Sequence, residues 1–344
     1  MIRTLINIIS LNNFYREYSD TLLQVGEFII KDSVAGMEDT NIDIRTISAL
    51  NLKSYVEALC TLIVRLQENK ATQTLVSIFS QEQGILTLLS HILLSPVVSE
   101  PSLILFPKPK DTAEEAVNDT KAEILEMLKS LVNHIFTRCP PQTKPSTLGY
   151  FKTLSSIIST AVEQIQTVYI YSKCPISKFP ETSQRVLLAI LNLVSKSSNI
   201  IDFYSIYSET ARRLLTTVLL PELMVTEREI EDFDYNEVEF VNFSMDVCSD
   251  QNSKVAKTLS MRILKNFCEK IDGLLTFTAV GMMALADTIL AQRSEEDLLK
   301  EFPVVQPIIQ SEFVKGNKAE KILDVCLLVI TAIENMLSNR PDLM

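Results

Sequence analysis

Residues 121–136 read KAEILEMLKSLVNHIF, and this stretch decides the fold class. Its apolar residues recur three and four positions apart, so that on a helix they share one face. These residues are Ile124, Leu125, Leu128, Leu131, Val132, Ile135 and Phe136. A face this wide predicts a helix that is sandwiched between two neighbours.

The same apolar period continues along nearly the whole chain and predicts about twelve helices. The expected spans are 3–31, 47–68, 72–95, 113–138, 147–171, 182–197, 200–219, 227–247, 252–271, 274–291, 296–312 and 318–338. Three helix starts carry a hydroxyl residue three positions before an acid: Thr112 with Glu115, Thr226 with Glu229, and Ser294 with Asp297. Such pairs satisfy the free N–H groups of a first helical turn.

Composition agrees with a helical chain. The 344 residues are 47% hydrophobic but include only seven glycines, where average usage predicts roughly twenty or more. Strand-rich folds need glycine for turns and bulges, so its scarcity favours helices. The thirteen prolines cluster between the apolar runs, where they end helices.

Short connectors imply antiparallel helix pairs, and such pairs must stack on one another to bury their apolar faces. The pairs recur at roughly forty residues, within the spacing of HEAT and armadillo repeats. We therefore expect an all-α fold, an α-α superhelix of HEAT-like pairs forming a single array over residues 1–344. A compact helical bundle is the alternative. Residues 96–112 are expected to form a longer inter-repeat loop, and 221–250 an acidic insertion or linker.

The sequence offers little catalytic chemistry. The two histidines, His91 and His134, lie in apolar helical stretches without a second metal ligand at suitable spacing. The glycines never cluster, so no phosphate-binding loop is expected. We expect no enzyme, no cofactor and no metal site. The six cysteines occur singly, which is typical of buried thiols in a reducing compartment: Cys60, Cys139, Cys174, Cys248, Cys268 and Cys326.

Net charge and hydropathy limit the classes of partner that the chain is expected to bind. The formal net charge is −11, which disfavours nucleic acid because a polyanion repels an acidic protein. The longest charge-free apolar stretch, residues 273–286, is shorter than the ~20 residues that a bilayer needs, so we expect no membrane insertion.

The most unusual segment is PELMVTEREIEDFDYNEVEFV, residues 221–241. Seven carboxylates fall within 227–239, interleaved with aromatic and aliphatic residues. We predict a protein-binding surface here for a basic partner, with the carboxylates facing that partner and the aromatic rings packing on the scaffold. Its residues are Glu229, Glu231, Asp232, Phe233, Asp234, Glu239 and Phe240. A capped, solvated helix start is the alternative.

Three features of this region resemble the importin-β (karyopherin) superfamily: Pro221, the run from Glu231 to Asp234, and the triplet Glu239, Phe240, Val241. The flanking helices 201–220, 258–273 and 321–333 are similar too, so the resemblance covers roughly residues 182–335. The segment looks most like the branch that returns importin-α to the cytoplasm, with other large importins as near alternatives. The chain departs from the family's pattern at 236–237 and 242–243. It is also much shorter than a complete transport receptor, which predicts a fragment, a truncated gene product or a short relative.

The resemblance implies a nuclear transport receptor that shuttles between nucleus and cytoplasm. Its implied partners are the Ran GTPase in its GTP form, importin-α or another cargo, and phenylalanine–glycine nucleoporins. Binding of the GTPase would shift the curvature of the superhelix between cargo-holding and cargo-releasing states. A helical-repeat scaffold without transport activity is the alternative function, and a helical metabolic enzyme is a third.

Overall fold

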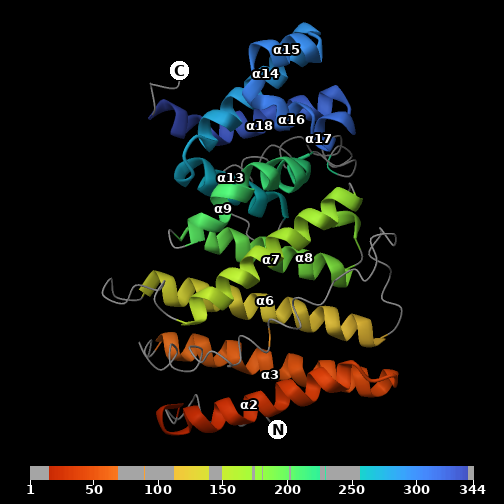
Figure 1. The fold of residues 1–344 in the computed structure, drawn as a ribbon, viewed down its shortest axis with the longest axis vertical. Helices are drawn as coiled ribbons and strands as arrows, with labels where there is room; N and C mark the ends of the chain where they lie inside the picture. Colours follow the sequence, from red (N-terminus) through yellow and green to blue (C-terminus); the bar gives the residue numbers. More distant parts are fainter. Residues whose placement is uncertain are drawn as a thin grey trace. The chain divides into compact units, whose positions relative to one another are not determined.

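The computed structural model describes residues 15–68, 89, 112–138, 149–172, 175–179, 181–200, 203–224, 229 and 256–339. Within these ranges every regular element is a helix and no strand occurs (Figure 1). The predicted all-α class is therefore confirmed for the described residues. The expected loop at 96–112 lies outside them except for Thr112. The expected helices 72–95 and 227–247 lie outside them except for Leu89 and Glu229.

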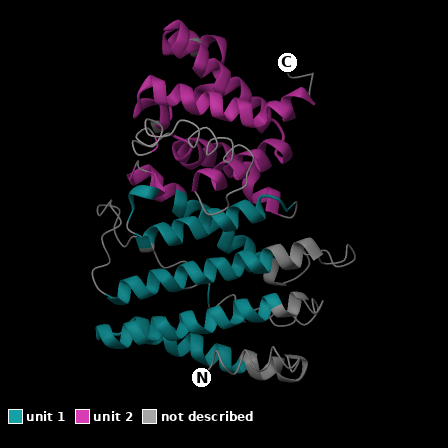
Figure 2. Cartoon of the chain, turned by 180° about the vertical axis from the view of Figure 1, so that it is seen from behind, with its two compact units in different colours: residues 1–165, 177–202 teal, residues 166–176, 203–344 magenta. Residues whose placement is uncertain are grey.

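The chain divides into two compact units, and each is described by itself (Figure 2). Unit 1 comprises residues 1–165 and 177–202, and unit 2 comprises 166–176 and 203–344. The long helix α7 (Gly149–Ser172) begins in unit 1 and ends in unit 2. The single array expected over residues 1–344 stays a prediction.

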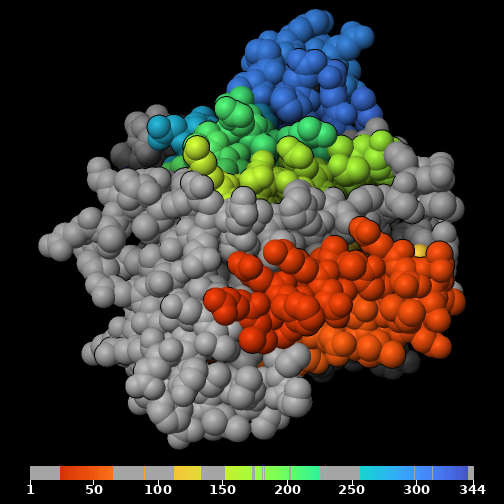
Figure 3. Space-filling view, turned by 60° about the horizontal axis from the view of Figure 1, so that its bottom comes forward, coloured from red at the N-terminus to blue at the C-terminus, as the bar shows by residue number. Residues whose placement is uncertain are grey.

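Apart from the start of α7, the described helices of unit 1 are α2 (Tyr15–Met37), α3 (Ile42–Glu68), α6 (Thr112–Arg138) and α8 (Glu181–Ser197). A short turn joins α2 to α3, and the two pack side by side (Figure 3). In that turn Asn41 N–H donates to Asp39 Oδ1 over 2.8 Å, and Asp43 N–H donates to Asn41 Oδ1 over 2.9 Å. These local bonds fix a tight reversal, which makes α2 and α3 antiparallel. The next packing partners are α3 with α6, and α6 with α8.

Helices α3, α6 and α8 run parallel, and residues that contact each other on neighbouring helices lie a constant number of positions apart in the sequence. Lys53 Nζ of α3 donates to Asp119 Oδ2 of α6 over 2.9 Å, and Arg185 Nη1 of α8 donates to Asp119 Oδ1 over 2.6 Å. Both pairs are separated by 66 residues, as is the pair Asn192–Glu126. We call Lys53, Asp119 and Arg185 the polar ladder. One offset along the helices means that they stack in parallel and in register.

The core of unit 1 repeats with the same offset. Leu59, Leu125 and Leu191, each 66 residues after the last, are all buried. Full burial of one such side chain contributes about 1.5–3 kcal/mol, so equivalent positions on successive helices form a stabilising column. The offset is longer than the roughly forty residues expected from the sequence. It spans one long helix, of 27 residues in both α3 and α6, together with the chain that leads to the next parallel helix.

Two described helices contain stretches that are long and apolar enough to cross a membrane, judged by length and composition: Ile42–Val64 in α3 and Leu274–Ala291 in α14. We expected no such stretch because the longest charge-free apolar run is residues 273–286, whereas both of these stretches include charged residues. Both helices have packing partners within their units. Helix α3 lies against α2 and α6, while α14 lies against α13 and α18. These neighbours cover about half of each apolar stretch, 44% in α3 and 56% in α14.

Unit 2 is built on three long helices among its described residues: α13 (Ala256–Lys270), α14 (Leu274–Ala291) and α18 (Ala319–Ser338). Each of the three packs against the other two. Between α13 and α14 the chain turns at Gly273, whose φ of 73° lies in the left-handed region that favours glycine. The predicted bounds 274–291 and 318–338 agree closely with α14 and α18.

The helix predicted over 296–312 is broken into short pieces. These are α15 (Glu295–Glu301), η5 (Pro303–Val305), α16 (Gln306–Ile309) and α17 (Glu312–Lys315). Pro303 and Pro307 each begin a new turn, because proline cannot donate to the preceding one. The cap predicted before α15 is confirmed: Asp297 N–H donates to Ser294 Oγ over 3.2 Å.

A π-turn interrupts the helix that follows α8. The chain runs through α9 (Tyr204–Leu214), the π-turn η4 (Leu215–Leu219) and α10 (Leu220–Glu222), three residues past the predicted end at 219. Pro221 explains the interruption, because its ring clashes with the carbonyl four residues earlier in an α-helix. The wider turn lets Leu220 N–H donate to Leu215 O, five residues back. Thr217 Oγ1 donates to Arg213 O over 2.7 Å and satisfies that carbonyl.

Candidate functional site

The buried carboxylate of Glu222 lies in unit 2 where the acidic segment begins. Helix α10 ends at this residue, and its side chain is only 6% exposed. Tyr169 of α7 donates its phenolic O–H to Glu222 Oε1. The backbone N–H of Ile176, in the short helix η2 (Ile176–Lys178), donates to the same oxygen over 2.6 Å. Through these two hydrogen bonds Glu222 links residues 166–176 to the rest of unit 2.

The environment of Glu222 favours its protonated form. Burial raises the pKa of Glu222 from 4.5 to about 6, because a charged carboxylate loses its hydration inside the protein. The hydrogen bonds from Tyr169 and Ile176 and the charge of Lys257 act in the opposite direction, while Glu229 adds to the increase of the pKa. The two hydrogen bonds and the charge of Lys257 therefore offset only part of the desolvation cost of the ionised Glu222 carboxylate.

Glu229, the first residue of the predicted binding surface, is used inside unit 2. Lys257 Nζ, on the first turn of α13, donates to Glu229 Oε1 over 2.6 Å. The two side chains are only 11% and 18% exposed, respectively, so this ion pair is largely shielded from water. Glu229 thus faces the chain's own lysine.

The other residues of the predicted surface lie outside the described part of the chain: Glu231, Asp232, Phe233, Asp234, Glu239 and Phe240. The described residues bring Glu229 together with Lys257 and Glu222. The acidic insertion expected over 221–250 likewise falls outside the described part except for 221–224 and Glu229, and Pro221 and Glu222 belong to α10. The binding surface therefore stays a prediction.

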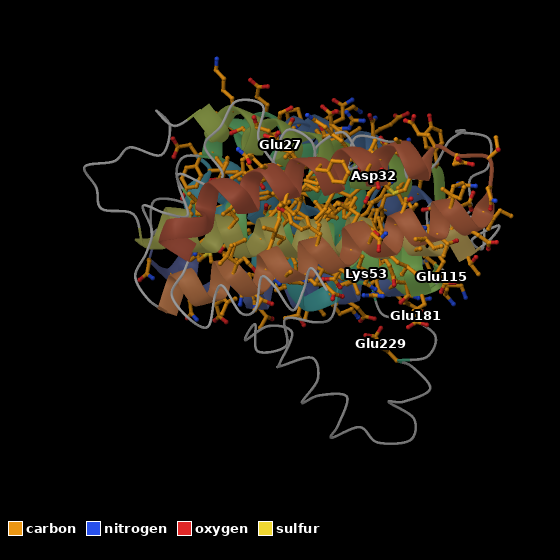
Figure 4. All side chains as sticks on the ribbon, turned by 90° about the horizontal axis from the view of Figure 1, so that it is seen from below. Glu27, Asp32, Lys53, Glu115, Glu181 and Glu229 are labelled. Atoms are coloured by element: carbon orange, nitrogen blue, oxygen red, sulfur yellow. The ribbon has the colours of Figure 1, made fainter. Side chains whose placement is uncertain are left out.

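The polar ladder forms a second charged region, in unit 1. Seen along the stack, the labelled residues Lys53, Glu115 and Glu181 lie on one side of unit 1, away from Glu27 and Asp32 (Figure 4). Arg185 also approaches Glu123, with Nη2 and Oε1 3.5 Å apart. Burial raises the pKa of Glu123, and the neighbouring Glu57 adds to the increase. Carboxylates on α6 are thus held between cations of α3 and α8.

The described thiols lie in apolar surroundings. Cys268 and Cys326 are buried and Cys60 is half-buried, and none of the three is in a disulfide. Burial raises the pKa of each of these thiols to about 12, so the nucleophilic thiolate is scarce at neutral pH. The prediction of buried thiols is confirmed for Cys268 and Cys326. Cys139, Cys174, Cys248 and the side chains of His91 and His134 lie outside the described residues.

Among the residues that the structure describes, no group of three or more histidine, cysteine, aspartate or glutamate side chains could hold a metal ion. We also compared the chain with models of protein families, with curated proteins and with solved structures, and none of these comparisons found a match.

Sequence reasoning missed Glu222, Tyr169 and Lys257. One signal was available: Glu222 follows the apolar run Val218–Leu220 and precedes Leu223 on a helix, a position where a carboxylate is expected to be buried and hydrogen-bonded. No local pattern indicates Tyr169, because its partner lies 53 residues away.

Proposed function

We propose that the chain is a protein-binding scaffold of stacked helix pairs, a HEAT-like α-superhelix, with nuclear transport as its specific role. The observation that supports the scaffold is the common offset of 66 residues that relates α3, α6 and α8. Stacked repeats present equivalent helix positions side by side, and so offer a continuous surface to a macromolecule.

The charges of unit 1 support a protein partner. The polar ladder crosses three helices, and its side chains remain partly exposed, at 20% for Lys53 and Asp119 and 43% for Arg185. Charged groups arranged in this way govern the choice of partner and the association rate more than the affinity. A macromolecule with complementary charges could contact all three helices at once.

The transport role rests on the resemblance of residues 182–335 to the importin-β superfamily. This resemblance implies three kinds of partner: the Ran GTPase, importin-α or another cargo, and phenylalanine–glycine nucleoporins. It also implies that the protein shuttles between nucleus and cytoplasm. The mechanism would be non-covalent: cargo and GTPase would stabilise different curvatures of one superhelix. The broader alternative is a scaffold that holds a protein assembly together.

A retention assay separates the two functions. The full chain is immobilised and exposed to Ran locked in its GTP form or loaded with GDP. A transport receptor retains the GTP form selectively, because only differential affinity can couple nucleotide state to cargo release. Equal retention of both forms, or none, rules out the transport role and leaves the scaffold.

A scattering measurement tests the superhelix itself. A stack of helix pairs gives an elongated particle, whereas a helical bundle of this length gives a compact one with a radius of gyration of roughly 20 Å. A value close to that of the compact bundle would refute the superhelix.

A further inference from the structure

Helix α3 exposes one line of residues that its packing partners α2 and α6 leave open. The line comprises Asp43, Ile47, Leu50 and Ser54, which recur three or four positions apart and so share one side of the helix. Ile47 is 59% exposed and Leu50 is 47% exposed. Because the line continues into buried Ala58, its open part spans about three turns, or roughly 18 Å of helix.

The next helix of the stack shows what covers this line elsewhere in unit 1. In α6 the equivalent positions, 66 residues later, are Ala113, Ala116 and Thr120, and all three are buried. Helix α3 covers them, since it packs along α6 and Thr120 Oγ1 donates to Ala49 O over 3.0 Å. The line that α3 covers on α6 is therefore open on α3 itself, where Ile47 and Leu50 stand in place of two alanines.

Helix α2 contributes a second exposed line. Val25, Phe28 and Asp32 lie three and four positions apart and so share one side of α2. Phe28 is 71% exposed. The two helices lie side by side at the surface of unit 1 (Figure 3). We call the two lines together the open stacking surface. A group of large exposed apolar side chains is typical of a protein-binding site.

The charges at the open stacking surface indicate the chemistry of its occupant. Both charged residues on the two lines, Asp32 and Asp43, are acidic. Among the exposed residues of 24–44, the acids Asp32, Glu38, Asp39 and Asp43 stand against one base, Lys31. These carboxylates favour an occupant with lysine or arginine beside its apolar residues. They disfavour a second copy of the chain, because two copies would bring the same carboxylates together.

We propose that the open stacking surface docks one amphipathic helix of a partner protein, which lies along α3 as α3 lies along α6. The partner helix presents an apolar stripe of about three turns to Ile47, Leu50 and Phe28, with lysine or arginine at the edges of the stripe. This inference rests on the proposed protein-binding function but not on nuclear transport. It places the contact in unit 1, apart from the acidic segment 221–241.

A synthetic helix with leucine at every third or fourth position and lysine between them is the probe. The full chain is titrated into the fluorescein-labelled peptide, and fluorescence anisotropy gives the dissociation constant. A peptide with the same residues in scrambled order has no apolar stripe and should bind about tenfold more weakly or worse. A helix with glutamate in place of lysine should also bind more weakly, because its charges repel Asp32 and Asp43.

Variants of the chain test whether the peptide uses this surface. Ile47→Ser combined with Leu50→Ser should weaken binding about tenfold, because it removes the apolar centre of the surface. The matched control, Met283→Ser with Leu290→Ser, replaces side chains of α14 that are 47% and 71% exposed and should leave the dissociation constant unchanged. Asp43→Asn should weaken binding about twofold and reduce its dependence on salt. Circular dichroism at 222 nm checks that each variant is folded.

Cross-linking locates the bound peptide. A benzophenone group at the centre of the peptide is irradiated, and mass spectrometry identifies the labelled residues. Cross-links within residues 24–54 support the surface. Cross-links confined to other parts of the chain overturn it, as do equal affinities of the wild type and the variant with serine at 47 and 50.

Two further outcomes separate this inference from its alternatives. Analytical ultracentrifugation without peptide tests for a second copy: a wild-type dimer that the variant with serine at 47 and 50 does not form would show that the chain itself occupies the surface, which overturns the basic partner. The Ran retention assay is independent of the peptide. Loss of selectivity for the GTP form rules out transport while peptide binding at α3 still supports the docking surface.

Discussion

Replacing Glu222 by glutamine should change how the stability of the protein depends on pH. The side chain of Glu222 is buried, and its pKa is about 6 in the folded chain against an ordinary value of 4.5. A difference of 1.5 units corresponds to about 2 kcal/mol between the two protonation states. Glutamine keeps a carbonyl oxygen that can accept from Tyr169 and Ile176, but it cannot ionise.

The sign follows from the direction of this shift. The folded chain binds the proton of Glu222 more tightly than the unfolded chain does, so the full stabilisation is present below pH 4.5. It is lost as the pH rises from 4.5 through 6, because the buried group must then carry a charge. Between pH 4.5 and pH 7.5 the free energy of unfolding of the wild type should fall by about 1–2 kcal/mol more than that of Glu222→Gln.

Urea denaturation followed by circular dichroism at 222 nm measures this difference, with both proteins at both pH values. The comparison between variants cancels the titration of groups common to both. Similar slopes with urea in all four experiments would show that the same amount of surface is exposed. If the difference between the two proteins is the same at pH 4.5 and 7.5, Glu222 does not titrate near pH 6 and the reasoning is wrong.

Three further predictions concern the two units. Asp119→Asn weakens two ion pairs of the polar ladder and should destabilise unit 1 by about 1–2 kcal/mol in thermal unfolding. The control Glu38→Gln, at an exposed position, should cost less than about 0.5 kcal/mol. Equal losses in the two variants would show that the ladder contributes nothing to stability. Leu125→Ala should cost about 2–5 kcal/mol because it empties a buried position, while Leu327→Ala, at a position 54% exposed, should cost under about 1 kcal/mol by the same assay. Cys268 should resist alkylation by iodoacetamide at pH 8 in the folded chain and react in guanidinium chloride; rapid labelling of the folded protein, detected by peptide mass spectrometry, contradicts a buried thiol.

Much of the helical content could be predicted because helix boundaries are local features. The residues that begin and end α14 carry their own signals, since Gly273 supports the turn before it and the apolar period stops near Ala291. The prediction of one helix over 296–312 was wrong for an equally local reason. Pro303 and Pro307 break the helix although the apolar period continues through them.

The stacking offset could not be predicted. It depends on how far the connectors carry the chain before the next parallel helix begins, and connector length has no periodic signature. The site is non-local in the same way. Glu222 receives bonds from residues 46 and 53 positions away, so no window of sequence contains both the acceptor and its donors.

The widened turn before Pro221 has a geometric consequence for the buried acid. An α-helix advances about 100° per residue, so one residue more or less in a helix rotates everything after it by that angle. Ordinary α-helical winding through residues 215–219 would instead turn Glu222 by about that angle around the axis, away from its two donors. The π-turn Leu215–Leu219 therefore determines the direction in which the Glu222 side chain points, and with it whether Tyr169 and Ile176 can donate to the carboxylate.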